Sequence, residues 1–517
     1  MIVRGARVPA GDGLSPLVDL HVTGDRVTAV VPAGRGVDGA CGPVLDADGR
    51  VALPGFVDAH SHAESAVFDA DVQTALLRQG VTTLVLGLDG VSYAPDPDGR
   101  GWAGEYFAGI LGAHPTFRGG PVADLLATYE AAVPVNVAYL APHGTMRHAV
   151  LGASDVPADD DARARIVALL AAALDDGAVG LSTGLEYVPA AHADRAELEA
   201  LLTEVARRGL VHASHARGYE EHASRALDEL ADLAAATGAR THVSHLHGPA
   251  ADVLGALARA EARGVRMTFD TYPFLRGCSI LSMVALPTWL PLADAAATRA
   301  ALDDPATAAR VAEHLATLDD LWPRVTLASV PGELAWTEGL ALLDVAARLG
   351  TSPADAALRV LVASDLRVTC IFEQPPTGTD ASLSLLAAHA GHTVGSDAVY
   401  PGSRPHPRGW ATFTTTLERM LAPRGPWSWA DAVEHLARRA ARAHTLARGT
   451  LGVGAVADLV LLDPQRLAAH ATYDAPRVPS DGIDDVVVAG VPVLADGRLT
   501  GATPGRALRP DPEGTGR

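Results

Sequence analysis

The fold is indicated by the stretch Pro54-Gly55-Phe56-Val57-Asp58-Ala59-His60-Ser61-His62, in which an apolar strand ends with two histidines. Side chains two residues apart in an extended segment point to the same side, so His60 and His62 can hold one ion. Functional groups at the carboxyl end of a strand are typical of α/β barrels, in which the strand ends form the active site. An α/β barrel requires further strands of this kind along the chain.

The middle of the chain alternates short apolar strands with amphipathic helices, which is the pattern of repeated strand–helix units around a parallel sheet. Helical stretches at Asp69–Gln79, Ala193–Arg208 and His222–Thr237 are each followed by glycine, the residue preferred just beyond a helix end. Eight strands are predicted, as in an α/β fold of the (β/α)8 TIM barrel type. They span residues 51–58, 81–88, 135–141, 178–183, 210–214, 240–245, 266–272 and 393–397.

Both ends of the chain are instead rich in short strands and turns. Asp19–Val31 alternates apolar and polar residues around a Gly24-Asp25 turn, and strands are also predicted at Ala457–Asp463 and Asp485–Val493. We expect one small β-sandwich domain formed by both termini. Its parts are residues 1–52 and 449–517, and the barrel takes 53–448. Within the barrel, about 276–390 is too long for one connection and is expected to be an inserted helical lid.

Composition argues against several partners. The 41 basic and 61 acidic residues give a net charge of −20, which repels phosphate backbones and argues against nucleic acid. No apolar run reaches the roughly 18–20 residues that cross a membrane. The first residues lack the apolar core of a signal peptide, so a cytoplasmic location is expected. Cys41, Cys278 and Cys370 are too scattered for a disulfide framework.

The chain contains no lysine, since all 41 basic residues are arginine. This excludes a Schiff-base lysine, a P-loop lysine and a carboxylated lysine that bridges two metal ions. Any bridge between metal ions in this chain has to come from another residue type.

More candidate metal ligands follow other predicted strands. His215 ends the fifth strand, His245 the sixth and Asp397 the eighth. A single histidine is more often a core or surface residue, but this repeated placement at strand ends favours a metal site. Imidazole nitrogens with carboxylate oxygens suit zinc, with positions left open for water and substrate.

With these motifs the chain resembles the amidohydrolase superfamily and, more narrowly, the N-acyl-D-amino-acid deacylases (D-aminoacylases). The superfamily motifs are PGFVDAHSH at 54–62 and GTLGVGAVADLVLLDP at 449–464. The narrower motifs are QGVTTLVLG at 79–87, GAVGLSTGLEYVP at 177–189, SHARGY at 214–219, SHLHG at 244–248, DTYPF at 270–274, and GSD with HPRGWATF within 395–413. The resemblance implies a TIM barrel with a terminal β-sandwich, and zinc-dependent removal of the acyl group from N-acyl-D-amino acids by metal-activated water.

The resemblance also implies roles for single residues. It makes Asp397 both a ligand and the catalytic group that moves protons. The implied metal ligands are His60, His62, His215, His245 and Asp397. The deacylases carry a bridging cysteine after the second strand, where this chain has Asp89. Asp89 could bridge two ions, bind one, or be a turn residue before Gly90, so one or two zinc ions are expected.

Substrate-binding residues are implied in the same way. Arg408 matches an arginine that holds the substrate carboxylate, as a bidentate guanidinium can. Tyr187, Tyr272 and Ser279 match substrate contacts, and His247 replaces a lysine of the relatives. Alternative roles remain open for these residues, namely core packing for the tyrosines and a surface ion pair for Arg408. Glu186 is a further carboxylate candidate, as a ligand or as a hydrogen-bonding residue.

Two other functions remain open. A cyclic-amide hydrolase of dihydroorotase or hydantoinase type would share the fold, but its commonest site uses the bridging lysine that this chain lacks. A non-catalytic scaffold is the alternative outside enzymes, and the strand-end ligands argue against it. The expected partner is a small N-acyl amino acid, while the oligomeric state is not indicated.

Overall fold

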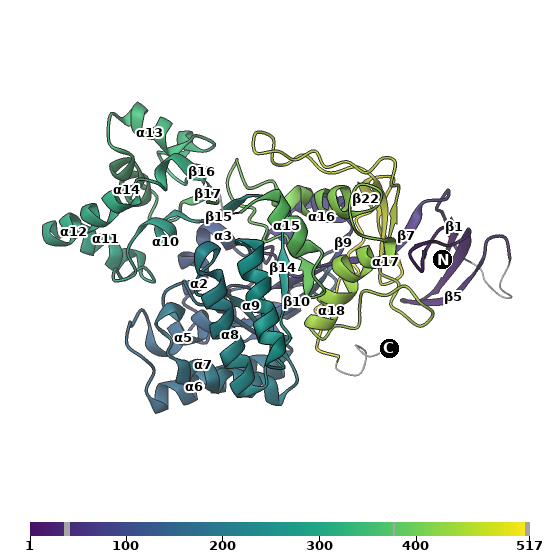
Figure 1. Cartoon of the computed structure of the whole chain (residues 1–517), viewed down its shortest axis with the longest axis horizontal. Coiled ribbons are helices and arrows are strands. Elements are labelled where there is room, and N and C mark those ends of the chain that lie inside the picture. The colour runs from purple at the N-terminus through teal and green to yellow at the C-terminus, as the bar shows by residue number, and fades with distance from the viewer. Residues whose placement is uncertain (36–41, 376–377, 512–517) are drawn as a thin grey trace.

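The computed structural model describes residues 1–35, 42–375 and 378–511 (Figure 1). A barrel covered by helices forms the centre of the molecule. A domain built from both termini lies at one end of the barrel, and an inserted domain projects from the other (Figure 1). No helix among the described residues is long and apolar enough to cross a membrane. Cys41 lies outside the described residues.

Eight parallel strands form the barrel, and each overlaps one predicted strand. In sheet order they are β8 (Phe56–Asp58), β9 (Val81–Leu86), β10 (Asn136–Pro142), β11 (Gly180–Gly184), β12 (Val211–His215), β13 (Arg240–Val243), β14 (Thr268–Thr271) and β18 (His392–Val394). The first and last strands close the ring just beyond their ends, where the amide of Ala59 donates to Val394 O at 3.2 Å and that of Asp397 to His60 O at 2.7 Å. The predicted (β/α)8 barrel is confirmed.

The barrel helices begin and end where the sequence indicates. Gly80, Gly209 and Gly238 follow the helices α1 (Ala70–Arg78), α7 (Arg195–Arg207) and α8 (Ala223–Thr237). Their φ angles are 83°, 67° and 77°, the left-handed conformation that ends a helix without strain in glycine. The helices that cover the barrel are α1 (Ala70–Arg78), α4 (Val122–Ala127), α5 (His143–Leu151), α6 (Asp160–Asp176), α7 (Arg195–Arg207), α8 (Ala223–Thr237), α9 (Ala250–Ala262), α15 (Asp380–Ala387), α16 (Arg408–Met420), α17 (Trp429–Val433) and α18 (Arg439–Ala443).

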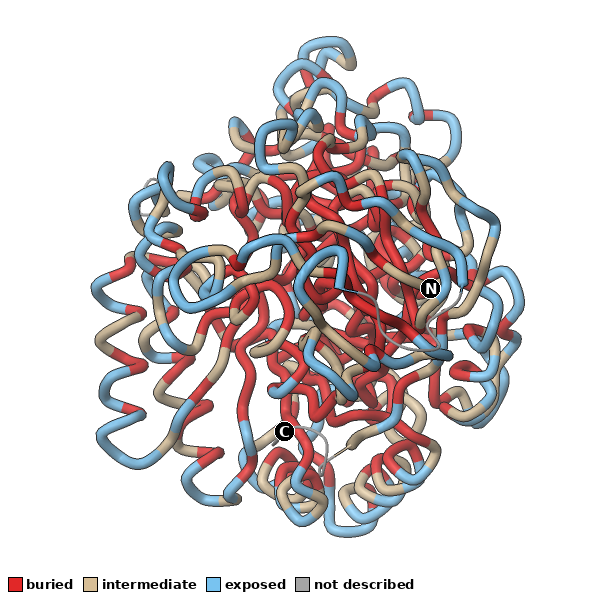
Figure 2. Tube along the Cα trace, turned by 90° about the vertical axis from the view of Figure 1, so that its right-hand side faces the viewer, coloured by how far each residue is buried: buried red, intermediate tan, exposed pale blue. Residues whose placement is uncertain are grey.

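The barrel strands are buried on both faces. Every residue of β9 and β10 is buried, as is expected for parallel strands with helices on one side and a packed interior on the other. The buried backbone runs through the middle of the molecule, and exposed residues lie on the outer helices and loops (Figure 2). The interior is therefore rigid enough to hold side chains at its strand ends in fixed positions.

The terminal domain is a sandwich of two sheets, as predicted. One sheet contains β5 (Arg26–Pro32), β4 (Val18–Thr23), β1 (Ile2–Ala6) and β6 (Val44–Asp46). The other contains β22 (Arg498–Leu499), β21 (Val491–Ala495), β20 (Ile483–Val488), β19 (Leu459–Leu462) and β7 (Val51–Pro54). Leu20 from the first sheet and Leu459 from the second belong to one buried cluster, which joins the two ends of the chain.

The single strand predicted at 51–58 is wrong, because this stretch forms two strands in different domains. β7 pairs with β19 in the sandwich, while β8 pairs with β9 in the barrel. Gly55 separates them, and a Cβ atom there would lie 2.1 Å from Thr82 Oγ1. The chain can pass this close to β9 only because residue 55 has no side chain.

The insertion before β18 contains both helices and a small sheet. Its helices are α10 (Leu281–Ala285), α11 (Ala295–Asp303), α12 (Pro305–Leu315), α13 (Leu342–Leu349) and α14 (Pro353–Ala363). The antiparallel strands β15 (Arg276–Ile280), β17 (Thr369–Glu373) and β16 (Val325–Ser329) were not foreseen. The insertion has its own buried cluster around Trp322, and β15 and β17 lie beside the barrel mouth (Figure 1). The predicted limits of the domains stay a prediction.

Candidate metal centre and substrate cavity

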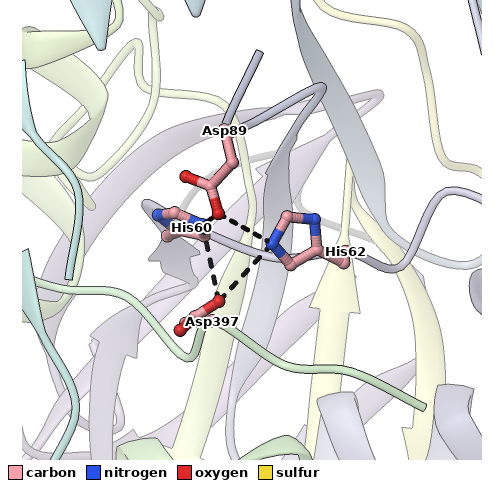
Figure 3. Close-up of side chains that lie close together, drawn as sticks. All are labelled: His60, His62, Asp89 and Asp397. Carbon is pink, nitrogen blue, oxygen red and sulfur yellow. Dashed lines mark ion pairs between the residues drawn. The ribbon is translucent and has the colours of Figure 1, made fainter. Parts of the chain in front are cut away.

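Four predicted ligands meet at the carboxyl end of the barrel. His60 and His62 follow β8, Asp89 follows β9 and Asp397 follows β18 (Figure 3). Oδ2 of Asp89 lies 3.5 Å from Nε2 of His60 and 3.4 Å from Nε2 of His62. Oδ1 of Asp397 lies 3.6 and 3.4 Å from the same two nitrogens. All four side chains are buried.

A second group of predicted ligands lies on the other side of Asp89. Oδ1 of Asp89 is 3.5 Å from Nε2 of His245 and 3.9 Å from Nδ1 of His215. These two nitrogens are 3.0 Å apart. The two carboxylate oxygens of Asp89 thus face different histidine pairs, and Asp89 belongs to both groups.

Three of these residues adopt a backbone conformation that is rare outside glycine. The φ angles of Asp89, His245 and Asp397 are 54°, 35° and 48°. Such a conformation costs on the order of 1–3 kcal/mol, and it persists where the surrounding structure imposes it. The strain is therefore concentrated at the strand ends that carry the candidate ligands.

The two carboxylates of the first ligand group are ionised. Burial by itself would raise the pKa of Asp89, but His60 and His245 hold that pKa well below its usual range. Burial would also raise the pKa of Asp397, but the guanidinium of Arg408 and His245 lower it to about 2. Both carboxylates are therefore ionised at neutral pH, and they favour a cation between them.

The arrangement fits a divalent metal ion. Among the described residues, both ring nitrogens of His60 and Oδ1 of Asp89 are buried without a hydrogen-bond partner, which is costly unless a ligand satisfies them. Two ligand atoms at about 2.1 Å from a tetrahedral ion lie about 3.4 Å apart. The separations of 3.4–3.6 Å in the first group match this value.

Asp270, at the end of β14, was missed by the sequence analysis. Its Oδ1 accepts from the amide of His245 at 2.9 Å, and its Oδ2 accepts from Nε2 of His242 at 3.1 Å. The same Oδ2 lies 3.7 Å from Nδ1 of His60. Asp270 therefore orients candidate ligands of both groups, and its place in the motif DTYPF was the available signal.

The sequence analysis also missed Asp58, which lies in the motif PGFVDAHSH. Its Oδ1 accepts from the amides of Ser396 at 2.8 Å and His60 at 3.2 Å. Its Oδ2 accepts from the hydroxyl of Ser396 at 2.6 Å. Asp58 thus fixes the segment that carries Asp397 to the strand that carries His60, across the seam of the barrel.

Glu186 lies beside the second ligand group. Nε2 of His215 donates to Oε2 of Glu186 at 2.9 Å, while Nδ1 of His215 faces Asp89. A carboxylate on the far nitrogen of a ligating histidine fixes the ring and its tautomer. Of the two possibilities for Glu186, the structure favours hydrogen bonding over direct ligation.

A cavity of about 610 Å³ opens above the two groups. Four of the predicted substrate residues line it, namely Tyr187, Tyr272, Ser279 and His247. His247 donates from Nδ1 to the carbonyl of His245 at 2.8 Å and stacks on Tyr219 with ring centroids 4.6 Å apart. The cavity is of a size that suits a small organic substrate.

Arg408 is buried rather than exposed, which excludes a surface ion pair. It does not itself line the cavity, and its guanidinium lies 4.8 Å from the ring centre of Tyr272. One of its nitrogens, Nη1, lies 2.8 Å from Oδ2 of Asp397, but the guanidinium forms no well-oriented hydrogen bond within the described residues. Such a buried group has donors to offer to an incoming anion.

Comparison with known proteins gives the family. Residues 43–494 match the model of the Amidohydrolase family, so the chain belongs to that family. It is 31% identical over 527 residues to N-acyl-D-glutamate deacylase of Alcaligenes xylosoxydans xylosoxydans, covering 99% of this chain and 96% of the relative. It is 32% identical over 521 residues to N-acyl-D-aspartate deacylase of the same organism, covering 98% and 95%.

Solved structures agree. The chain is similar to N-acyl-D-glutamate deacylase from Bordetella bronchiseptica complexed with zinc and a phosphonate inhibitor, with a TM-score of 0.81 and 28% identity over 98% of this chain and 99% of that one. A D-hydantoinase from Thermus sp. is 15% identical, with a TM-score of 0.58 over 99% of each chain, and shares the fold alone.

We predict that Asp270→Asn weakens zinc binding by about 10–100-fold, because an amide keeps only one acceptor oxygen for the two donors, the His245 amide and Nε2 of His242, and so disturbs the support of the ligands. Competition with a chromogenic chelator measures the affinity. Asp485→Asn is the matched control, since Asp485 is also buried but lies in the sandwich domain. Wild-type zinc affinity in Asp270→Asn would contradict the positioning role.

Proposed function

We propose that the protein is a zinc-dependent amide hydrolase that removes the acyl group from N-acyl-D-amino acids. The observation that carries the proposal is the position of Asp89, which joins two histidine pairs beneath a substrate-sized cavity. The full-length similarity to deacylases of N-acyl-D-glutamate and N-acyl-D-aspartate, one of them solved with zinc, supports it.

In this proposal the two groups hold up to two zinc ions. His60, His62 and Asp397 would hold one ion and His215 and His245 the other, and Asp89 would contribute one oxygen to each group. The chain has no lysine, so a carboxylated lysine cannot form the bridge. When bound, zinc lowers the pKa of water to about 7 and polarises a carbonyl oxygen.

Asp397 is the residue that moves protons. Its pKa of about 2 keeps it ionised at neutral pH, and its Oδ1 faces the histidines of the first group. It takes the proton of the attacking water and delivers it to the leaving nitrogen of the amide. Asp58 holds the neighbouring Ser396, which keeps Asp397 in its place.

Arg408 and the residues that line the cavity orient the substrate. The guanidinium of Arg408 offers unsatisfied donors and takes the α-carboxylate of the substrate, which competes with Asp397 for the same nitrogens. Tyr187, Tyr272, Ser279 and His247 line the space beside it and contact the rest of the substrate. The partner is thus a small molecule that carries both an amide and a carboxylate.

A cytoplasmic location completes the proposal. Cys278 and Cys370 are both free thiols, and thiols persist in a reducing compartment. A cyclic-amide hydrolase stays the weaker alternative, because its commonest bridge requires lysine and the similarity to a hydantoinase shows the fold alone.

The main test is hydrolysis by the zinc-loaded protein. We expect release of free amino acid from N-acetyl-D-amino acids, and little turnover of hydantoins, dihydroorotate or N-acetyl-L-amino acids. Asp397→Asn should lower kcat by about 10²–10⁴-fold while zinc stays bound, because an amide cannot accept the proton. Undiminished activity of a zinc-loaded Asp397→Asn would refute the role of Asp397, and preferred turnover of hydantoins would refute the deacylase.

Arg408→Met should raise KM for N-acetyl-D-amino acids about 10–100-fold, since a charge-assisted hydrogen bond contributes about 1.5–3 kcal/mol. Steady-state kinetics are measured on an N-acetyl-D-amino acid and on the same compound with a carboxamide in place of its carboxylate. A contact between Arg408 and the carboxylate affects KM for the acid only. Arg404→Met, at an exposed arginine in the preceding turn, is the control. An equal rise in KM for both substrates would show that Arg408 does not bind the carboxylate.

Asp89→Ala should lower the zinc content at both positions, because it removes one ligand from each group. Asp89→Cys should restore it in part, since thiolate sulfur is a zinc ligand. Metal analysis after dialysis gives the stoichiometry. Asp48→Ala is the control, because Asp48 has a similar φ of 50° but lies on the surface of the sandwich domain. Two zinc ions retained by Asp89→Ala would show that Asp89 does not bridge.

A further inference from the structure

The inserted domain supplies an apolar wall to the substrate cavity. The wall lies beside Tyr272, the ring against which the Arg408 guanidinium is placed. Its apolar residues come from β15, α10 and β17, and two more come from the barrel side. They are Cys278, Met283, Val284 and Phe372 from the insertion, and Ile110 and Leu185 from the barrel side.

The geometry of the substrate directs its side chain to this wall. In an amino acid the side chain and the carboxylate are attached to the same carbon atom. When Arg408 holds the carboxylate, the side chain of the substrate therefore lies close to Tyr272 and Cys278. Burial of an apolar side chain against such a wall contributes about 1.5–3 kcal/mol.

The charged residues around the cavity are mainly acidic. Apart from the candidate ligands, Glu186 and Glu220 line it with carboxylates. Nε2 of His247 lies 3.8 Å from Oε1 of Glu220, so any positive charge on that ring is already faced by a carboxylate. His222 lies at the rim, with a side chain that is 70% exposed.

Arg217 is the arginine among the described lining residues, and its guanidinium is already held. Its Nε lies 3.2 and 3.3 Å from the two carboxylate oxygens of Glu229. Its Nη1 donates to the carbonyls of Ala191 at 2.9 Å and Leu185 at 3.3 Å. The guanidinium of Arg217 is therefore engaged with Glu229 and with backbone carbonyls, and it is not directed at a substrate carboxylate.

We propose that this cavity selects N-acyl-D-amino acids with an uncharged, apolar side chain and rejects those with a side-chain carboxylate. This specificity rests on the proposed deacylase function. A second carboxylate on the substrate would lose water against the apolar wall and meet like charges from Glu186 and Glu220. The protein would thus differ from two of its relatives, whose names specify D-glutamate and D-aspartate.

The test compares kcat/KM of the zinc-loaded protein for N-acetyl-D-methionine, N-acetyl-D-glutamine and N-acetyl-D-glutamate. Glutamine and glutamate have nearly the same shape, so their ratio isolates the charge. We expect kcat/KM for N-acetyl-D-methionine to exceed that for N-acetyl-D-glutamate by at least about 100-fold. The value for N-acetyl-D-glutamine should exceed that for N-acetyl-D-glutamate by about tenfold. A glutamate value equal to or above that of methionine would overturn the specificity while leaving the deacylase function intact. Hydrolysis of none of the three would overturn both.

A charge-neutralising variant tests the cause. Glu220→Gln should raise the ratio of kcat/KM for N-acetyl-D-glutamate over N-acetyl-D-methionine about three- to tenfold, because one repulsive charge is removed. The ratio does not respond to a general loss of activity, which affects both substrates alike. Glu221→Gln is the matched control, since Glu221 is the next residue and its side chain is 81% exposed. An unchanged ratio in Glu220→Gln would overturn the electrostatic explanation, and the wild-type panel would still decide the specificity.

Discussion

The sharing of one carboxylate between two histidine pairs is the interaction on which the site depends. Asp89 places Oδ2 toward His60 and His62, and Oδ1 toward His215 and His245. Four strands of the barrel have to end at the right height and angle for one small side chain to reach both pairs. The left-handed backbone conformation of Asp89 costs conformational free energy. The closed barrel around Asp89 is rigid enough to maintain that conformation.

Hydrogen bonds between strands keep the ligands in this arrangement. Asp58 connects the first and last strands of the barrel by binding Ser396, and Asp270 connects His60, His242 and His245. These buried carboxylates contact neighbouring ligand residues, so they act on the chemistry through orientation. The same principle applies to Glu186 and His215.

Much of the fold could be predicted from the sequence, because apolar strands and glycine-ended helices follow local rules. The eight strands, the terminal sandwich and the grouping of the predicted ligands at strand ends all follow from such patterns. The division of 51–58 at Gly55 could not be predicted, because it depends on contact with Thr82 of another strand. Asp270 was missed similarly, since its partners belong to other strands.

The amino-acid sequence alone specifies which atoms are available for chemistry. It supplied imidazoles and carboxylates at strand ends, and it excluded a lysine bridge because the chain has no lysine. The folded structure establishes that Asp89 faces both histidine pairs, that Arg408 is buried against Asp397, and that Glu186 and Glu220 line the cavity. The physical reason is that distance, burial and charge balance arise between residues far apart in the chain, whereas residue type and periodicity are local.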